Sequence, residues 1–300
     1  MPRGLRSRAF RRRFVVAATL GFACLYVAIS WFTADRLTRA TNRPLMVDPH
    51  RLSRDVEPWQ ARTQDGLTLR GWRMPTADHR HLLVLVHGMW SSWLEMAGLG
   101  RDLHNQGYDV LLFDLRGHGQ SDPSRLSLGG RERGDLRTVM RWARAEGYPD
   151  DRVGWLGYSM GASTLMLEAA HNPAIHAAVL DSPYGDLPAL LKTQLSKHSR
   201  LPSWFNPGIL TAARLFYGLR TEELVPIKAA AFWGDRPLLL IHGESDSVVP
   251  VAQALRLGRA AGGSCTMLTL PGVEHVQAYN SDPERYVDRI AGFFHDHLSP

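Results

Sequence analysis

The hydrophobic positions of the chain form two kinds of pattern. The first is a single run from Phe14 to Ala34 that contains no charged residue in 21 positions. As an α-helix this run would span roughly 31 Å, about the thickness of the hydrocarbon core of a bilayer. Beyond residue 80, short apolar runs alternate instead with segments of helical periodicity. The two patterns predict a membrane-spanning helix followed by an α/β domain.

Six apolar runs predict most strands of that domain. They lack alternation with polar residues, which is typical of parallel strands covered on both faces by helices. Before them, residues 56–74 predict two antiparallel strands joined at Asp65 and Gly66, a residue pair that favours hairpin turns. We expect a mostly parallel, doubly wound sheet opened by this hairpin. The six runs are HLLVLVHG, YDVLLFD, RVGWLG, IHAAVLDS, RPLLLIHGESD and CTMLTLPG.

The alternation stops at Tyr184 and resumes about fifty residues later. Residues 184–232 contain helical patterns and no convincing strand. An insertion at this place predicts a short helical lid over the carboxyl ends of the strands, where open α/β sheets bind ligands. We therefore expect an α/β core made of residues 55–183 and 233–300, joined to the apolar run by a linker over residues 35–54.

The charge of the chain is concentrated at its start. The formal net charge is +6, and residues 1–34 hold six arginines and no acidic residue, so the remainder is neutral. We therefore discount nucleic acid as a partner. The arginines predict a cytoplasmic tail, a single anchor over residues 14–34 and a domain on the extracytoplasmic side. A cleaved secretory signal is the alternative, because Ala28 and Ser30 offer small residues at a suitable spacing.

One serine stands between two glycines at the end of a predicted strand. The stretch Gly157-Tyr158-Ser159-Met160-Gly161 fits the G-x-S-x-G pattern, in which a tight strand-to-helix turn exposes a nucleophilic hydroxyl. An ordinary serine that caps the following helix is the alternative. A strand before the motif, a helix after it and LVHG upstream favour the nucleophile.

Five segments in a fixed order carry a resemblance to a known family. They are VLVHGMW at 84–90, FDLRGHGQSD at 113–122, LGYSMGAS at 156–163, LLLIHGESDSVVP at 238–250 and LPGVEHV at 270–276. Through them, residues 56–298 resemble the α/β-hydrolase superfamily, and in particular its serine esterases and thioesterases. The resemblance implies an α/β-hydrolase fold and a Ser, acid, His order along the chain.

Carried onto this sequence, the resemblance implies a catalytic Ser159, Asp246 and His275. The backbone N–H groups of Met89 and Met160 would form the oxyanion hole. Glu244 and Asp181 are alternative positions for the acid. A serine needs an imidazole to take its proton, and the imidazole needs a carboxylate to orient it.

These features predict a membrane-anchored serine hydrolase that cleaves a small-molecule carboxylic ester or thioester through an acyl-enzyme. No metal and no organic cofactor is expected. An aminopeptidase of the same fold is the enzymatic alternative. A non-catalytic, membrane-anchored binding protein is the alternative from another class, because fold does not imply function.

Overall fold

A computed structural model describes residues 3–42, 48–51, 56–78 and 80–300. The chain divides into two compact units, which are described separately. One comprises residues 1–38 and 191–219, and the other comprises residues 39–190 and 220–300. The predicted linker falls partly on residues 43–47 and 52–55, which lie outside the described residues.

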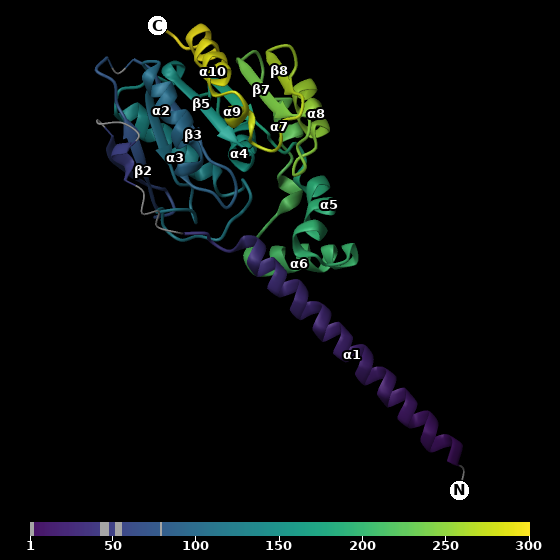
Figure 1. The fold of residues 1–300 in the computed structure, drawn as a ribbon. Helices are drawn as coiled ribbons and strands as arrows, with labels where there is room; N and C mark the ends of the chain where they lie inside the picture. Colours follow the sequence, from purple (N-terminus) through teal and green to yellow (C-terminus); the bar gives the residue numbers. More distant parts are fainter. Residues whose placement is uncertain (1–2, 43–47, 52–55, 79) are drawn as a thin grey trace. The chain divides into compact units, whose positions relative to one another are not determined.

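The larger unit contains an eight-stranded sheet with the order β1-β2-β4-β3-β5-β6-β7-β8 (Figure 1). The β1–β2 and β2–β4 pairs are antiparallel, and every other neighbouring pair is parallel. This is the predicted mostly parallel sheet opened by a hairpin. The strands are β1 (Glu57–Arg62), β2 (Thr68–Met74), β3 (Leu82–Val86), β4 (Asp109–Phe113), β5 (Val153–Tyr158), β6 (Ala177–Asp181), β7 (Leu238–Gly243) and β8 (Cys265–Leu270).

The hairpin between β1 and β2 turns where the sequence predicted. Thr63 N–H donates to the Leu67 carbonyl at 2.8 Å, and Gly66 N–H donates to the Thr63 carbonyl at 3.0 Å. Gly66 adopts φ +90°, a value that favours glycine because it has no Cβ. The Asp65-Gly66 turn prediction is confirmed.

Strands β3 to β7 are buried along their whole length. On one face, Leu83 and Leu85 of β3 pack in a cluster with Leu99 of α2 and Phe294 of α10. Helices therefore cover the sheet, as the unbroken apolar runs predicted. The helices are α2 (Ala97–Asn105), α3 (Arg133–Ala145), α4 (Met160–Ala169), α8 (Val251–Ala261), α9 (Ala278–Ser281) and α10 (Pro283–His297).

Strand β8 departs from the predicted pattern. Five of its six residues are half-buried and the remaining one, Thr266, is exposed, although its sequence CTMLTL looks like that of the buried strands. It lies at the edge of the sheet and pairs with β7 alone. Position at an edge, which an apolar run does not reveal, accounts for the difference.

Residues 184–232 form helices and no strand, as expected of the insertion. They comprise α5 (Leu187–Ser199), α6 (Asn206–Tyr217) and α7 (Pro226–Ala230), with short 3₁₀ turns at Ser203–Phe205 and Thr221–Glu223. The placement of this segment over the site stays a prediction.

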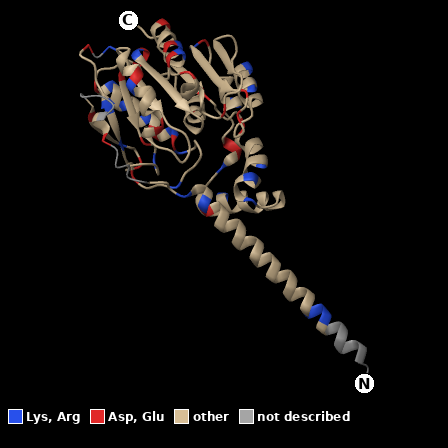
Figure 2. Cartoon of the chain, viewed as in Figure 1, with Lys and Arg blue, Asp and Glu red and all other residues tan. Residues whose placement is uncertain are grey.

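The smaller unit is built on α1 (Arg3–Thr38), which continues four residues beyond the predicted span. By length and composition, Phe10–Thr38 could cross a membrane, with a mean hydropathy of 2.0 in its most apolar window. Figure 2 shows this helix almost free of charged residues after its first turns. Helix α6 packs on α1, and Gly208 N–H of α6 donates a hydrogen bond to Tyr26 Oη of α1 at 3.1 Å.

Candidate active site

Ser159 lies in a sharp turn between β5 and α4. Its backbone has φ +49° and ψ −112°, a strained conformation for a residue with a side chain. A Cβ on Gly157 would lie 2.5 Å from the Ala162 nitrogen, and one on Gly161 would lie 2.3 Å from the Val86 carbonyl oxygen. Neither position has room for a larger residue. Both glycines are therefore needed for the turn that presents the Ser159 hydroxyl.

The imidazole of His275 connects Ser159 to Asp246. Its Nε2 lies 2.9 Å from Ser159 Oγ, and its Nδ1 lies 2.6 Å from Asp246 Oδ2. With a proton on Nδ1 donated to the carboxylate, Nε2 accepts the hydrogen bond of the serine hydroxyl. The three side chains come from the turn after β5, the loop after β7 and the loop after β8. The structure thus brings together the three residues named from the sequence.

Asp246 is surrounded by hydrogen-bond donors. Its Oδ1 accepts from Val248 N–H at 2.9 Å and Val249 N–H at 2.7 Å. The Nε2 atom of buried His242 lies 3.2 Å from Oδ2. Burial opposes the charge of Asp246, but the hydrogen bonds from His242, His275 and Val249 N–H outweigh it and hold the pKa well below its usual value. This carboxylate stays ionised at neutral pH.

The alternative acids bind elsewhere. Glu244, exposed directly after β7, accepts a hydrogen bond at Oε1 from Thr269 Oγ1 at 2.9 Å. Asp181 is fully buried, and it accepts hydrogen bonds from Ser182 Oγ at 2.8 Å and Tyr286 Oη at 2.7 Å. Neither carboxylate is hydrogen-bonded to His275. The geometry favours Asp246 over both.

Asp181 and Ser182 nevertheless support the site, which the sequence did not indicate. The Asp181 carbonyl accepts a hydrogen bond from Ser159 N–H at 2.9 Å. Ser182 Oγ accepts one from Val276 N–H at 3.2 Å, directly after His275. The end of β6 therefore holds both the serine turn and the histidine loop.

The two predicted oxyanion donors come from different elements: Met89 follows strand β3, and Met160 begins helix α4 directly after Ser159. Met160 is the first residue of α4, where a helix leaves N–H groups without intrahelical partners. Met89 lines a pocket of about 180 Å³ together with Ser159 and His275. In the neighbouring turn, Gly88 N–H donates to Glu95 Oε2 at 2.7 Å and Trp90 N–H to His118 Nε2 at 3.3 Å.

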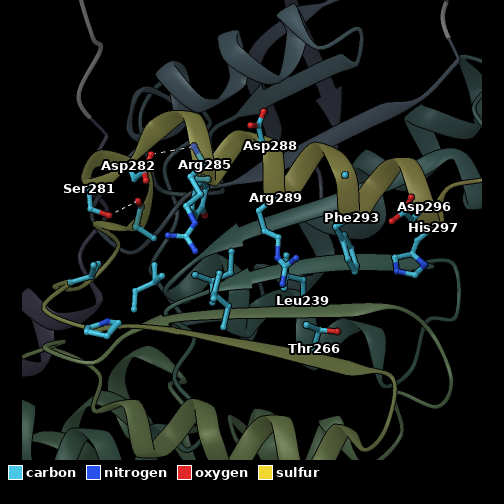
Figure 3. A pocket seen from close by; sticks show the side chains of 18 residues that line it. Leu239, Thr266, Ser281, Asp282, Arg285, Asp288, Arg289, Phe293, Asp296 and His297 are labelled. Carbon is cyan, nitrogen blue, oxygen red and sulfur yellow. Dashed lines mark hydrogen bonds between the residues drawn. The ribbon is translucent and has the colours of Figure 1, made fainter.

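A larger groove of about 870 Å³ lies away from Ser159, between α10 and strands β7 and β8. Figure 3 shows Arg285, Arg289 and Phe293 extending from α10 toward the sheet, whereas Asp288 points away from it. Neither Ser159 nor His275 lines this groove. We therefore place the candidate active site in the smaller pocket, where the reactive side chains are.

Within the described ranges, no group of three or more His, Cys, Asp or Glu residues is arranged to hold a metal ion.

Comparison with known proteins agrees with the fold. The family described as serine aminopeptidase, S33, matches residues 77–220. An uncharacterized protein of Mycobacterium tuberculosis strain H37Rv is 32% identical over 231 residues, which cover 76% of this chain and 73% of that protein. A monoacylglycerol lipase of Mycolicibacterium smegmatis is 27% identical over 272 residues, covering 75% of this chain and 91% of the lipase.

Solved structures also support the α/β-hydrolase fold. An esterase of Pyrococcus furiosus superposes with a TM-score of 0.72 at 25% identity, covering 88% of this chain and 99% of the esterase. The sheet order, the strand-turn-helix at Ser159 and these similarities agree with one another. The chain is therefore a hydrolase that belongs to the α/β-hydrolase superfamily.

Proposed function

We propose that this hydrolase is a serine enzyme that cleaves a small-molecule carboxylic ester or thioester through an acyl-enzyme. The observation that carries the proposal is the pair of hydrogen bonds joining Ser159, His275 and Asp246. A nucleophile, a base and an orienting carboxylate at these distances match the requirements of nucleophilic acyl transfer.

In the first half of the proposed reaction, Ser159 Oγ attacks the carbonyl carbon of the substrate and His275 Nε2 takes its proton. The ionised Asp246 stabilises the imidazolium that forms. The N–H groups of Met89 and Met160 would bind the oxyanion of the tetrahedral intermediate. The intermediate collapses, His275 returns the proton to the departing alcohol or thiol, and an acyl group remains on Ser159.

In the second half, water replaces the alcohol. His275 takes a proton from water as its oxygen attacks the acyl carbon, and then returns that proton to Ser159 Oγ as the acid leaves. Every proton moves through one imidazole, so this mechanism needs neither a metal nor an organic cofactor. The ester preference rests on the esterase of Pyrococcus furiosus and the monoacylglycerol lipase of Mycolicibacterium smegmatis.

The proposal includes attachment to a membrane by α1. Phe10–Thr38 has the length and composition for a span, and Arg11, Arg12 and Arg13 precede the apolar run. Basic residues remain on the cytoplasmic side, so the catalytic domain would lie on the extracytoplasmic side. Export followed by signal cleavage is the alternative. Cleavage would remove the N-terminal segment, so the mass of the mature protein distinguishes the two.

The activity can be tested on the full-length protein in detergent micelles. We expect hydrolysis of p-nitrophenyl butyrate and of a butyryl thioester, with little release of p-nitroaniline from leucine p-nitroanilide. Ser159→Ala is expected to lose at least about 10⁴-fold in kcat. Ser264→Ala, which removes an exposed hydroxyl bonded to the Gly234 carbonyl, is the matched control. Faster cleavage of the anilide would favour the aminopeptidase, and no turnover at all would favour the binding protein.

A further inference from the structure

A carboxylate shares the small pocket with the proposed nucleophile. Glu95 lines this pocket together with Ser159 and His275. A Cβ built on Gly88 would lie 3.3 Å from Glu95 Oε2 and 3.5 Å from Ser159 Cβ. The carboxylate and the serine therefore flank the same glycine.

Glu95 is held by a rigid element. It belongs to the 3₁₀ helix Trp93–Met96, which Ser92 caps through a hydrogen bond from Leu94 N–H. The Trp93 side chain is buried, and the backbone N–H of Trp93 donates to Asp114 Oδ1 at 2.8 Å. Because the residues at the two ends of this helix, Trp93 and Met96, are buried, the carboxylate has a fixed place in the pocket.

The carboxylate of Glu95 retains acceptor capacity. It accepts hydrogen bonds from Gly88 N–H and from the Ser91 side chain, whereas an ionised carboxylate offers about four lone-pair sites. Partial removal of water by the surrounding protein raises the pKa of Glu95. A donor from a bound molecule would replace the lost hydration.

The rest of the pocket is polar and small. Gln277 and Asn280 line it, and Asn280 Nδ2 donates to Gln277 Oε1 at 3.0 Å. At about 180 Å³ the pocket is smaller than the 300–1,000 Å³ typical of sites for drug-sized ligands. It therefore suits a small polar group better than a long acyl chain. Amides that both donate and accept match hydroxyl groups, which also do both.

We infer that Glu95 is a specificity-determining residue that binds a free hydroxyl on the alcohol part of the substrate, so that the enzyme prefers esters of small polyols. This inference rests on the proposed function. A carboxylate beside a developing oxyanion opposes the reaction of an ester that brings no donor, because like charges repel. A hydroxyl that donates to Glu95 offsets this cost in the preferred substrates.

The test compares three butyrates that differ in the alcohol: glycerol monobutyrate, propyl butyrate and butyrylcholine. The full-length protein in detergent is assayed as wild type, Glu95→Gln and Glu284→Gln. The glutamine of E95Q can still accept the Gly88 hydrogen bond. Glu284, exposed at the start of α10, is the control carboxylate.

We expect the wild type and E284Q to favour glycerol monobutyrate over propyl butyrate by about tenfold or more in kcat/KM. E95Q should lose most of this preference by slowing the glycerol ester while leaving propyl butyrate unchanged or faster. A purely structural role for Glu95 would slow both esters equally and overturns the inference. A preference that survives in E95Q, or one for butyrylcholine, also overturns it. If no ester is turned over, the proposed function fails and this inference fails with it.

Discussion

The hydroxyl of Ser182 accepts a hydrogen bond from Val276 N–H at 3.2 Å and donates one to Asp181 Oδ1 at 2.8 Å. Ser182 adopts φ +54° and Val276 φ +56°, so two strained residues meet at this contact. The buried end of β6 thus holds the loop that carries His275. The position of the imidazole depends on a residue that takes no part in the proposed chemistry.

Replacing Ser182 by alanine is therefore expected to loosen the His275 loop. Asp181 and Val276 N–H would each lose a partner, which costs about 1–3 kcal/mol of stability. We expect kcat/KM to fall about tenfold, mainly through kcat, because the imidazole is less often in place. Steady-state kinetics and thermal unfolding measure the two effects. Ser264→Ala should change neither, and full activity in S182A would contradict the positioning role.

Substitutions of the three carboxylates should identify the acid. Asp246→Asn should lower kcat roughly 10⁴-fold, because the amide favours the wrong imidazole tautomer. Glu244→Gln, which alters an exposed carboxylate bonded to Thr269, should keep activity within about twofold of wild type. Asp181→Asn should affect stability more than kcat. A larger kcat loss in E244Q or D181N than in D246N would reassign the acid.

The turn at Ser159 leads to a prediction about stability. Gly161→Ala would place a Cβ 2.3 Å from the Val86 carbonyl oxygen and 2.5 Å from that of His87. Backbone atoms of a central strand cannot move cheaply, so we expect a loss of more than about 3 kcal/mol. Gly292→Ala on α10, where nothing lies within 4 Å, should instead gain about 0.5–1 kcal/mol. Denaturant unfolding in detergent compares them, and equal stability of the two variants would refute the steric account.

Buried His87 predicts how stability depends on pH. Burial lowers its pKa to about 4, and Leu115 N–H donates to its Nε2 at 3.0 Å, so the folded state holds it neutral. The unfolded chain takes up a proton below about pH 6.5, so the stability from His87 is lost as pH falls from about 6.5 toward 4.

His87→Asn removes this titration. The slope of unfolding free energy against pH between 4.5 and 6 should then be smaller than in wild type by about 1.2 kcal/mol per pH unit. Ser264→Ala, which changes no titratable group, is the control and should keep the wild-type slope. Parallel wild-type and H87N curves would show that His87 does not titrate in this range.

Much of the fold follows from local patterns. The buried strands are continuous apolar runs, and the turns at Gly66 and Gly161 need glycine for steric reasons that a sequence records directly. The exposure of β8 was not predictable, because the run CTMLTL has the same composition whether a strand is central or at an edge. Edge position depends on the pairing of all eight strands.

The residues of the candidate site differ in how far the sequence predicts them. Ser159 stands in a local motif, whereas Asp246 and Glu244 are two residues apart and only the folded loop distinguishes them. Glu95 gave no signal, because a carboxylate in WLEM looks like the polar face of a helix. The contact of His242 with Asp246 and that of Ser182 with Val276 join residues whose side-chain directions the sequence does not contain.

The most direct test of the account is the reaction of the full-length protein with a fluorophosphonate, followed by intact-mass measurement and mapping of the labelled peptide. The account predicts one adduct on Ser159, none in Ser159→Ala, and labelling slowed at least about 10³-fold in His275→Ala. An adduct at another residue, or equal labelling rates in the wild type and His275→Ala, would contradict the claim that His275 activates Ser159.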